Sequence, residues 1–211
     1  MAQNMKTKYL VDPKTVLAGS NAFRAHEKRD AIYKVSTFLV ENFWGDPPQM
    51  ADALGVLLLI WNNALYRYGL FDFSALENTL RENMSTLASF RNRDILTFGE
   101  GDKRTIESLF AAFLNALKIA EGKLQGRQSP VSVAKALHLL APKFFPLWDD
   151  KIAKAYQCHY SADPSGNYIL FMTISKNMVE CLRGRVPVPP PSTILKVIDE
   201  YNYAKFTKKW I

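Results

Sequence analysis

One stretch of the chain decides how we interpret its fold: Ser129-Pro-Val-Ser-Val-Ala-Lys-Ala-Leu-His-Leu-Leu-Ala-Pro-Lys-Phe-Phe-Pro-Leu-Trp-Asp-Asp150. Ser129 followed by Pro130 is typical of an N-cap with proline in the first helical position, so a helix is predicted to begin here. Apolar residues occupy most positions up to Leu140. A helix that is apolar on most sides belongs in the interior of a helical protein.

Three polar residues in this stretch are candidates for chemistry. Lys135 and His138 are three residues apart and therefore share one face of the predicted helix. Apolar surroundings favour the neutral, nucleophilic form of a lysine amine. Asp149 follows a turn constrained by Pro146, where it can cap the next helix or hold a carboxylate near a cleft. A lysine and an aspartate placed in this way suit attack on C1′ of a sugar.

The same spacing also fits a purely structural explanation. Lys135 would then extend its stem toward solvent, His138 would be a hydrogen-bonded core histidine, and Asp149 would only cap a helix. Spacing alone leaves both explanations open.

Composition limits the classes of function that need to be considered. The chain has 211 residues and a net charge of +7, which favours a polyanionic partner such as nucleic acid. Its only cysteines are Cys158 and Cys181, so a zinc site of several thiolates and a four-cysteine cluster are excluded. The longest apolar run, residues 53–61, is too short to cross a bilayer. We therefore expect an intracellular protein without a metal or other cofactor.

Helical spacing of apolar residues recurs along the chain, and no convincing alternating strand is found, so we predict an all-α fold. About eight helices are expected, over residues 26–44, 48–68, 74 onward, 102–120, 129–140, 149 onward, 168–182 and 192–208. Residues up to about 21 are expected to be irregular, and residues 85–94 to form a short helix or loop. The chain is predicted to be one domain, 1–211, built as a two-lobed bundle with a cleft between the lobes. Residues 27–122 would form the central lobe, and residues 1–26 and 123–211 the second.

Two of these helices are expected to contribute to the core in different ways. In the first, Ile32, Val35, Phe38, Leu39 and Phe43 recur at spacings of three and four, which predicts one apolar face. In the second, residues 54–61 are apolar on every side, which predicts the central buried helix.

The stretch from Ser129 to Asp150 resembles the motif of the helix-hairpin-helix DNA glycosylases. In that family a helix bearing a catalytic lysine leads through a short turn to an essential aspartate that follows a proline. Lys135 and the sequence Pro146-Leu-Trp-Asp149 are similar to these two parts. The resemblance covers roughly residues 53–156, and it implies that Lys135 and Asp149 are the catalytic residues.

A second segment, Leu57-Leu-Leu-Ile-Trp-Asn-Asn-Ala-Leu-Tyr-Arg-Tyr-Gly69, is similar to a helix of the 8-oxoguanine branch of that family. There, an asparagine fills the hole that an everted base leaves in the duplex. The resemblance implies this role for Asn62 or Asn63. The other implied DNA-binding residues are Arg67, Arg127 and Ser132. The implied base pocket consists of His138, Trp148, Phe171 and Met172.

The chain also departs from the family pattern. The family hairpin carries Gly-x-Gly, whose backbone amides bind a DNA phosphate, whereas Pro130 and Ser132 stand near those places here. Proline has no amide hydrogen to donate. The interval from Lys135 to Asp149 is also several residues shorter than in the family. These departures leave open how a phosphate would be held and whether Lys135 forms a Schiff base.

We therefore expect a base-excision DNA glycosylase that flips a damaged or modified base and cleaves its N-glycosidic bond. AP lyase activity would accompany it if Lys135 attacks C1′. The expected partner is double-stranded DNA containing a modified base, with no membrane, and the expected state is a monomer in the cytoplasm, associated with the nucleoid. The alternative is a helical domain that binds DNA or a protein without catalysis.

Overall fold

The structure is a computed structural model that describes residues 9, 11–27, 30–190 and 192–211. Within these residues it has ten α-helices, eight of them with seven or more residues, and no strand, so the all-α prediction is confirmed. The helices are α2 (Pro13–His26), α3 (Asp30–Asn42), α4 (Pro47–Trp61), α5 (Asn63–Tyr66), α6 (Phe73–Arg91), α7 (Lys103–Ala116), α8 (Pro130–Leu140), α9 (Asp150–Ala155), α10 (Pro164–Leu182) and α11 (Ile194–Asn202). Two 3-10 turns, η1 (Ile95–Thr97) and η2 (Glu100–Asp102), precede α7, and a π-helix, η3 (Tyr203–Lys208), continues α11. None of the described helices is long and apolar enough to cross a membrane.

Short polar side chains fix where most of these helices begin. In each case an oxygen of the residue before the helix accepts a hydrogen bond from a backbone N–H of the first turn, which satisfies a donor that the helix itself leaves unpaired. The residues with this role are Asp12, Asp46, Asp72, Ser129, Asp149, Asp163 and Thr193. Four of these helices also carry proline in the first turn, where its missing N–H costs nothing.

Helix α4 lies at the centre of one group of helices, as its apolar sequence predicts. It packs against α3 and α6 and also contacts α8. Leu54, Leu57 and Leu58 have no exposed surface. Gly55 allows α6 to approach closely, because a Cβ there would lie 2.8 Å from Cε1 of Phe73.

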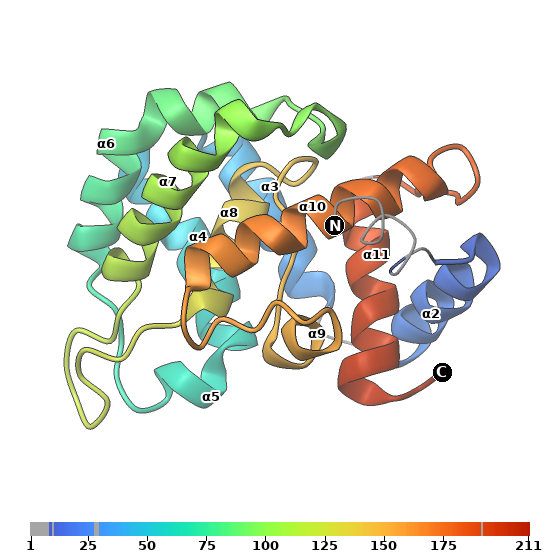
Figure 1. The fold of residues 1–211 in the computed structure, drawn as a ribbon. Coiled ribbons are helices and arrows are strands. Elements are labelled where there is room, and N and C mark those ends of the chain that lie inside the picture. The colour runs from blue at the N-terminus through green and yellow to red at the C-terminus, as the bar shows by residue number, and fades with distance from the viewer. Residues whose placement is uncertain (1–8, 10, 28–29, 191) are drawn as a thin grey trace.

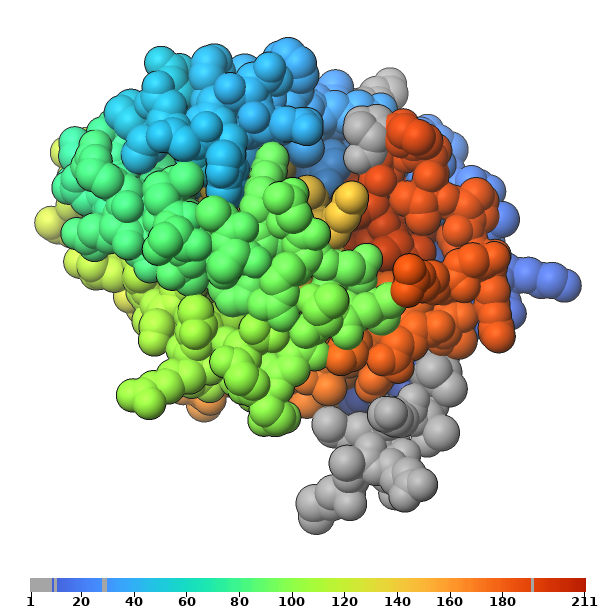
Figure 2. All heavy atoms as spheres, turned by 90° about the horizontal axis from the view of Figure 1, so that it is seen from above, coloured from blue at the N-terminus to red at the C-terminus, as the bar shows by residue number. Residues whose placement is uncertain are grey.

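A second group contains α2, α11 and η3, which lie beside one another at the right of Figure 1. Helices α9 and α10 lie between this group and α4–α8 in that view. Lys176 of α10 donates a hydrogen bond of 2.7 Å to the carbonyl oxygen of Phe98 beside η1. Figure 2 shows the green surface around residues 90–105 meeting the orange surface of α10 there. One hydrophobic core runs through both groups, from Val16 to Tyr201.

The expectation that the chain is irregular up to about residue 21 is wrong for residues 13–21, which belong to α2. Its start signal, Asp12 followed by Pro13, is present in the sequence, but its buried face is short of large apolar residues. Gly19 lies on that face because α11 packs directly on it, and a Cβ there would lie 2.8 Å from Cδ2 of Tyr201. Residues 1–8 and 10 lie outside the described residues.

The predicted apolar face of residues 26–44 is also wrong in part. Tyr33, Ser36 and Val40 are the buried residues of α3, whereas Phe38 is 62% exposed and Val35 is 48% exposed. The periodicity correctly indicates a helix but selects the wrong side of it. The reason is that α3 turns Tyr33 toward Trp61 and His138, which places the aliphatic stripe in solvent.

Several predicted boundaries change as well, and α10 begins at Pro164, four residues before its predicted start. The helix expected over residues 48–68 ends at Trp61, and α5 follows after a break at Asn62. Residues 85–91 continue α6 and do not form a separate element. Helix α7 ends at Ala116, earlier than predicted. The break at Asn62 matters most, because it creates part of the site described next.

Candidate functional site

Lys135 and Asp149 line the same pocket, which has a volume of about 80 Å³. Lys135 enters it from α8 and Asp149 from the turn before α9. Glu27, at the end of α2, and Asp199, on α11, add two further carboxyl groups. Much of the remaining lining is aromatic and comes from Phe23, Trp61, Trp148 and Tyr203.

Lys135 is oriented by the break between α4 and α5. Its Nζ donates a hydrogen bond of 3.2 Å to the carbonyl oxygen of Trp61 and another to Oδ1 of Asn62. The carbonyl is at the C-terminal end of α4, where the helix dipole favours a positive charge. Asn62 is in turn held by Ser132, whose Oγ accepts a hydrogen bond from its Nδ2. This chain of contacts fixes the Lys135 amine at the edge of the pocket, and Nζ lies 5.6 Å from the centre of the Trp61 ring.

Both carboxylate oxygens of Asp149 accept hydrogen bonds. The backbone N–H of Ile152 donates to Oδ1 over 2.7 Å, which makes Asp149 the N-cap of α9. The hydroxyl of Thr207, on η3, donates to Oδ2 over 2.8 Å. Lys151 also donates to the carbonyl oxygen of Thr207, over 3.1 Å, so η3 is joined to the start of α9 at two points. Asp149 is therefore held in one orientation.

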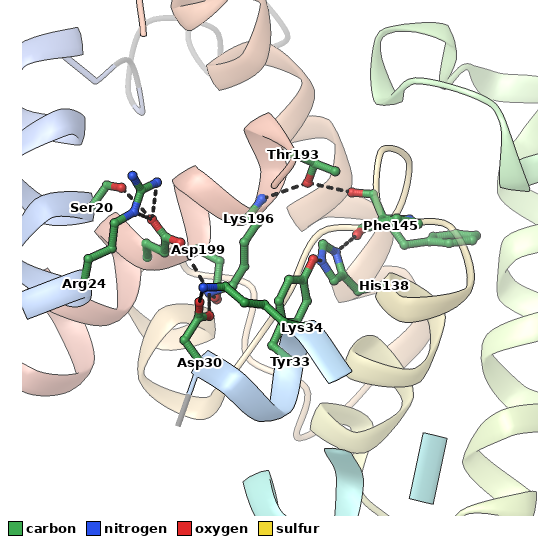
Figure 3. Close-up of polar contacts among 12 residues, drawn as sticks. Ser20, Arg24, Asp30, Tyr33, Lys34, His138, Phe145, Thr193, Lys196 and Asp199 are labelled. Carbon is green, nitrogen blue, oxygen red and sulfur yellow. Dashed lines mark hydrogen bonds and ion pairs between the residues drawn. The ribbon is translucent and has the colours of Figure 1, made fainter. Parts of the chain in front are cut away.

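Asp199 is in a different environment from Asp149. Only 13% of its side chain is exposed, and burial raises its pKa to about 6, although the Lys196 ammonium 3.6 Å from Oδ2 acts in the opposite direction. Lys196 itself is buried and also lies 3.4 Å from Asp30 and 3.7 Å from Glu200. Figure 3 shows Asp30 and Asp199 beside Lys196, with Arg24 on the far side of this cluster. The buried Lys196 ammonium thus forms ion pairs with three carboxyl groups, and one of these, Asp199, lines the pocket.

His138 does not line the pocket, although it shares α8 with Lys135. It is fully buried, its Nε2 lies 2.8 Å from the hydroxyl of Tyr33 and its Nδ1 lies 2.7 Å from the carbonyl oxygen of Phe145. Because the carbonyl can only accept, Nδ1 carries the hydrogen and Nε2 accepts from Tyr33. Burial lowers the pKa of His138 to about 4, so the ring is neutral at pH 7. His138 is a hydrogen-bonded core residue and not part of the base pocket.

Of the other predicted pocket residues, only Trp148 contributes to the lining. Phe171 stacks behind it, with ring centres 6.2 Å apart, and is almost fully buried. Met172 has no exposed surface. Neither Phe171 nor Met172 lines the pocket, and Phe171 supports its wall through Trp148.

The predicted DNA-binding residues divide into buried and exposed ones. Asn62 and Ser132 are buried and hold Lys135 in place, but Asn62 also lines a groove beside the pocket. Asn63, Arg67 and Arg127 are exposed. The Arg67 guanidinium lies 4.6 Å from the centre of the Tyr68 ring. Asn63 is exposed to solvent but lines neither the pocket nor this groove.

A shallow groove continues the pocket toward the surface. It shares Lys135, Asp149, Trp61 and Tyr203 with the pocket and has a volume of about 350 Å³. The groove extends over α5, the start of α8, the start of α9 and Thr207. A ligand too large for the pocket could thus lie in the groove while one of its parts enters the pocket.

The connection before α8 is not a short hairpin. Residues 117–129 join α7 to α8, and Ile119 forms two backbone hydrogen bonds across this connection, with Arg127 and Gly126. Pro130 has no N–H, and the N–H of Ser132 donates to Oγ of Ser129 over 3.1 Å. The structure therefore agrees with the sequence that a Gly-x-Gly phosphate grip is missing at this place.

Sequence reasoning did not find Asp199, Glu27, Tyr203 or Thr207. The Asp-Pro start of α2 could have indicated that a helix brings Glu27 near the site, but no local pattern marks Asp199 or Thr207 as pocket residues. Within the described residues, no group of three or more His, Cys, Asp or Glu side chains could hold a metal ion. In comparisons with family models, with curated proteins and with solved structures, the chain has no significant match.

Proposed function

We propose that this protein is a DNA glycosylase that removes a modified base by cleaving its N-glycosidic bond. The observation that carries the proposal is the convergence of Lys135 and Asp149 on one aromatic pocket that opens into a groove. A base turned out of a duplex needs a pocket with flat apolar walls, and its sugar needs a charged group beside C1′. Trp61, Trp148 and Tyr203 supply the walls, and Asp149 supplies the charge.

The arrangement assigns a separate task to each charged residue. As the bond between C1′ and the base breaks, positive charge develops on the sugar, and the Asp149 carboxylate stabilises it. Asp149 then accepts a proton from the water molecule that attacks C1′, which leaves an abasic site. Lys135 either stabilises negative charge nearby or, in its neutral form, attacks C1′ itself and gives AP lyase activity. The net charge of +7 favours association with the DNA backbone.

The test is a panel of duplexes that each contain one modified base: uracil, hypoxanthine, 8-oxoguanine or an N-alkylated adenine. Abasic sites are scored by alkaline cleavage for the wild type, Asp149→Asn and Asp72→Asn. Asp72 is a matched control, because it is also an aspartate that caps a helix, α6, but it lines neither the pocket nor the groove. We expect Asp149→Asn to lower the rate about 100-fold or more and Asp72→Asn to leave it nearly unchanged. Full activity of Asp149→Asn would contradict the proposal.

A second candidate is a binding domain without catalysis, and the exposed stripe of α3 favours it. Val35 and Phe38 are large apolar residues with 48% and 62% of their surface in solvent, which is more typical of a contact surface than of a single stray residue. The same panel distinguishes the two candidates. Binding of duplex DNA without release of any base would support the second one.

A further inference from the structure

The pocket contains a second carboxyl group whose surroundings differ from those of Asp149. Asp199 lies on α11, and both residues line the pocket together with Lys135. Asp149 accepts one hydrogen bond on each of its oxygens. Asp199 is mostly buried, and its Oδ2 lies 3.6 Å from the Lys196 ammonium, which is too far for a hydrogen bond.

Two carboxyl groups with contrasting surroundings in one pocket are the usual arrangement of an acid and a base in glycoside cleavage. In such a pair the group that accepts hydrogen bonds acts as the carboxylate, and the buried group, whose charged form is disfavoured, supplies the proton. Asp149 and Asp199 match these two descriptions. The aromatic residues Trp61 and Tyr203 line the same pocket.

We propose that Asp199 is a catalytic residue that donates a proton to the departing base. This inference rests on the proposed glycosylase function and deepens it, since it implies a substrate base that is a poor leaving group without protonation. The protonated Asp199 transfers its hydrogen to a nitrogen or oxygen of the base while the bond between C1′ and the base breaks. The bonding electrons leave with the base. Water adds to C1′, and Asp149 takes the proton that this water loses.

The reaction needs no further proton donor or acceptor besides Asp199 and Asp149. At the end of the reaction Asp199 is ionised and Asp149 is protonated, and exchange with solvent returns both to their starting forms. The products are a neutral base and an abasic sugar. No oxidation or reduction occurs.

The charges around Asp199 determine the pH range in which it can act. The groups that face it or its immediate partner are Lys196 and Glu200 on α11, Lys135 on α8, Asp149 before α9, Glu27 after α2 and Asp30 on α3. Burial, Asp149 and Glu200 raise its pKa, and Lys196 and Lys135 lower it, with a result of about 6. A useful fraction of Asp199 is therefore protonated near neutral pH, and the fraction falls tenfold for each pH unit well above 6.

The experiment measures single-turnover base excision from pH 5 to pH 9 for the wild type, Asp199→Asn, Glu200→Gln and Asp149→Asn, on the panel duplex that the wild type processes. Glu200 is a matched control, because it is also buried and lies 3.7 Å from Lys196 but does not line the pocket. We expect the wild-type rate to fall as pH rises above about 6 to 7. Asp199→Asn should be about 100-fold slower at pH 6, a typical loss for a general acid, and should lack this fall. Glu200→Gln should retain the shape of the profile.

A second measurement separates proton donation from a structural role. The released base is replaced by an analogue with an electron-withdrawing substituent, such as 5-fluorouracil in place of uracil, which departs with less help from a proton. The difference in rate between wild type and Asp199→Asn should then shrink at least tenfold, whereas the defect of Asp149→Asn should persist. An equal defect of Asp199→Asn on both bases would overturn the assignment.

The outcomes also separate this inference from the proposed function. If Asp149→Asn is inactive and Asp199→Asn keeps the wild-type pH profile, only the role of Asp199 is wrong. If the wild type releases no base from any duplex, both proposals are wrong. If thermal unfolding shows that Asp199→Asn does not fold, the proposal is tested on the wild type alone, by the dependence of its rate on the leaving group. A steep increase of its rate with a better leaving group at pH 6 would then exclude an efficient internal acid.

Discussion

At the scale of single residues, Asn62 shows how the structure gives a sequence motif a different role. The family resemblance implies that Asn62 or Asn63 fills a gap in DNA, and the structure shows Asn62 hydrogen-bonded to Ser132 and Lys135 at the side of the groove. The apolar run before it indicates a buried helix, but it does not reveal that the helix ends one residue earlier. A side chain at a helix end can turn inward, and this cannot be seen from periodicity alone.

Asn62→Ala should therefore affect both stability and the lysine. The change leaves the hydroxyl of Ser132 and the amine of Lys135 each without one partner, and we expect a loss of about 1–3 kcal/mol in the free energy of unfolding. Urea unfolding measures this loss. Asn63→Ala is the matched control, because Asn63 is exposed, and it should change stability by less than about 0.5 kcal/mol. Equal stability of the two variants would show that Asn62 does not hold Lys135.

Two buried groups should make opposite contributions to the pH dependence of stability. Burial lowers the pKa of His138 from 6.5 to about 4, so the folded state disfavours its charged form, and stability is lost as pH falls from 6.5 to 4. Burial raises the pKa of Asp199 from 3.8 to about 6, so the folded state binds the proton more tightly, and stability is gained as pH falls from 6 to 3.8. Each pKa shift changes the free energy of unfolding by about 3 kcal/mol, and because the two changes have opposite signs they nearly cancel.

Asp199→Asn removes the contribution of Asp199 to the pH dependence of stability and should reveal that of His138. The variant should lose about 3 kcal/mol more than the wild type between pH 7 and pH 4, measured by urea unfolding at each pH. Glu200→Gln, measured in the same way, controls for the disturbance of Lys196. Parallel curves for wild type and Asp199→Asn would contradict the assignment.

At the scale of elements, α8 and α3 show which helix features can be predicted. The start of α8 follows from Ser129 and Pro130, and Asp149 caps α9 as expected, because capping depends only on neighbouring residues. The buried side of α3 depends on what packs against it. Its apolar stripe and its buried face are both helical patterns, and only the contact of Tyr33 with Trp61 decides between them.

Substitutions in α3 should confirm which of its sides is buried. Val40 has no exposed surface, so Val40→Ala should cost about 1–3 kcal/mol through lost burial and a small cavity. Phe38→Ser removes a larger side chain that is 62% exposed, and it should cost less than about 1 kcal/mol. Thermal unfolding of the two variants tests this order. The reverse order would mean that the face bearing Phe38 is the one that packs.

The contact between η3 and α9 is the second feature at this scale. Thr207→Val keeps the shape of the side chain but removes the hydroxyl that donates to Asp149, so Asp149 loses one of its two orienting hydrogen bonds. We expect base excision to slow about tenfold, in line with about 1.4 kcal/mol for a hydrogen bond to a charged group. Thr207→Ser retains the hydroxyl and should restore the rate. If Thr207→Ser were as slow as Thr207→Val, packing of the methyl group would be the cause.

At the scale of the whole molecule, the sequence predicts the fold class and three of the residues that line the pocket, Lys135, Trp148 and Asp149, but not the others. Lys135 and Asp149 are 14 positions apart and joined by one turn, so local pattern is enough to relate them. Phe23, Asp199 and Tyr203 reach the pocket because α2 packs against α11. That contact joins segments about 170 residues apart, and small residues such as Gly19 allow it without leaving a periodic signal.

The distribution of charge over the molecule leads to the last prediction, which concerns DNA binding. The exposed residues Arg67 and Arg127 lie next to segments that form the groove, since Ala64 and Ser129 line it. Each arginine that contacts a phosphate adds about 0.9 to the slope of log affinity against log salt concentration. Arg67→Ala and Arg127→Ala should therefore each weaken binding to duplex DNA and reduce this slope by about one, measured by fluorescence anisotropy between 50 and 200 mM salt. Lys103→Ala is the control, because α7 lines neither the pocket nor the groove, and it should leave the slope unchanged. If all three variants reduced the slope equally, DNA would be attracted by the overall charge and not guided into the groove.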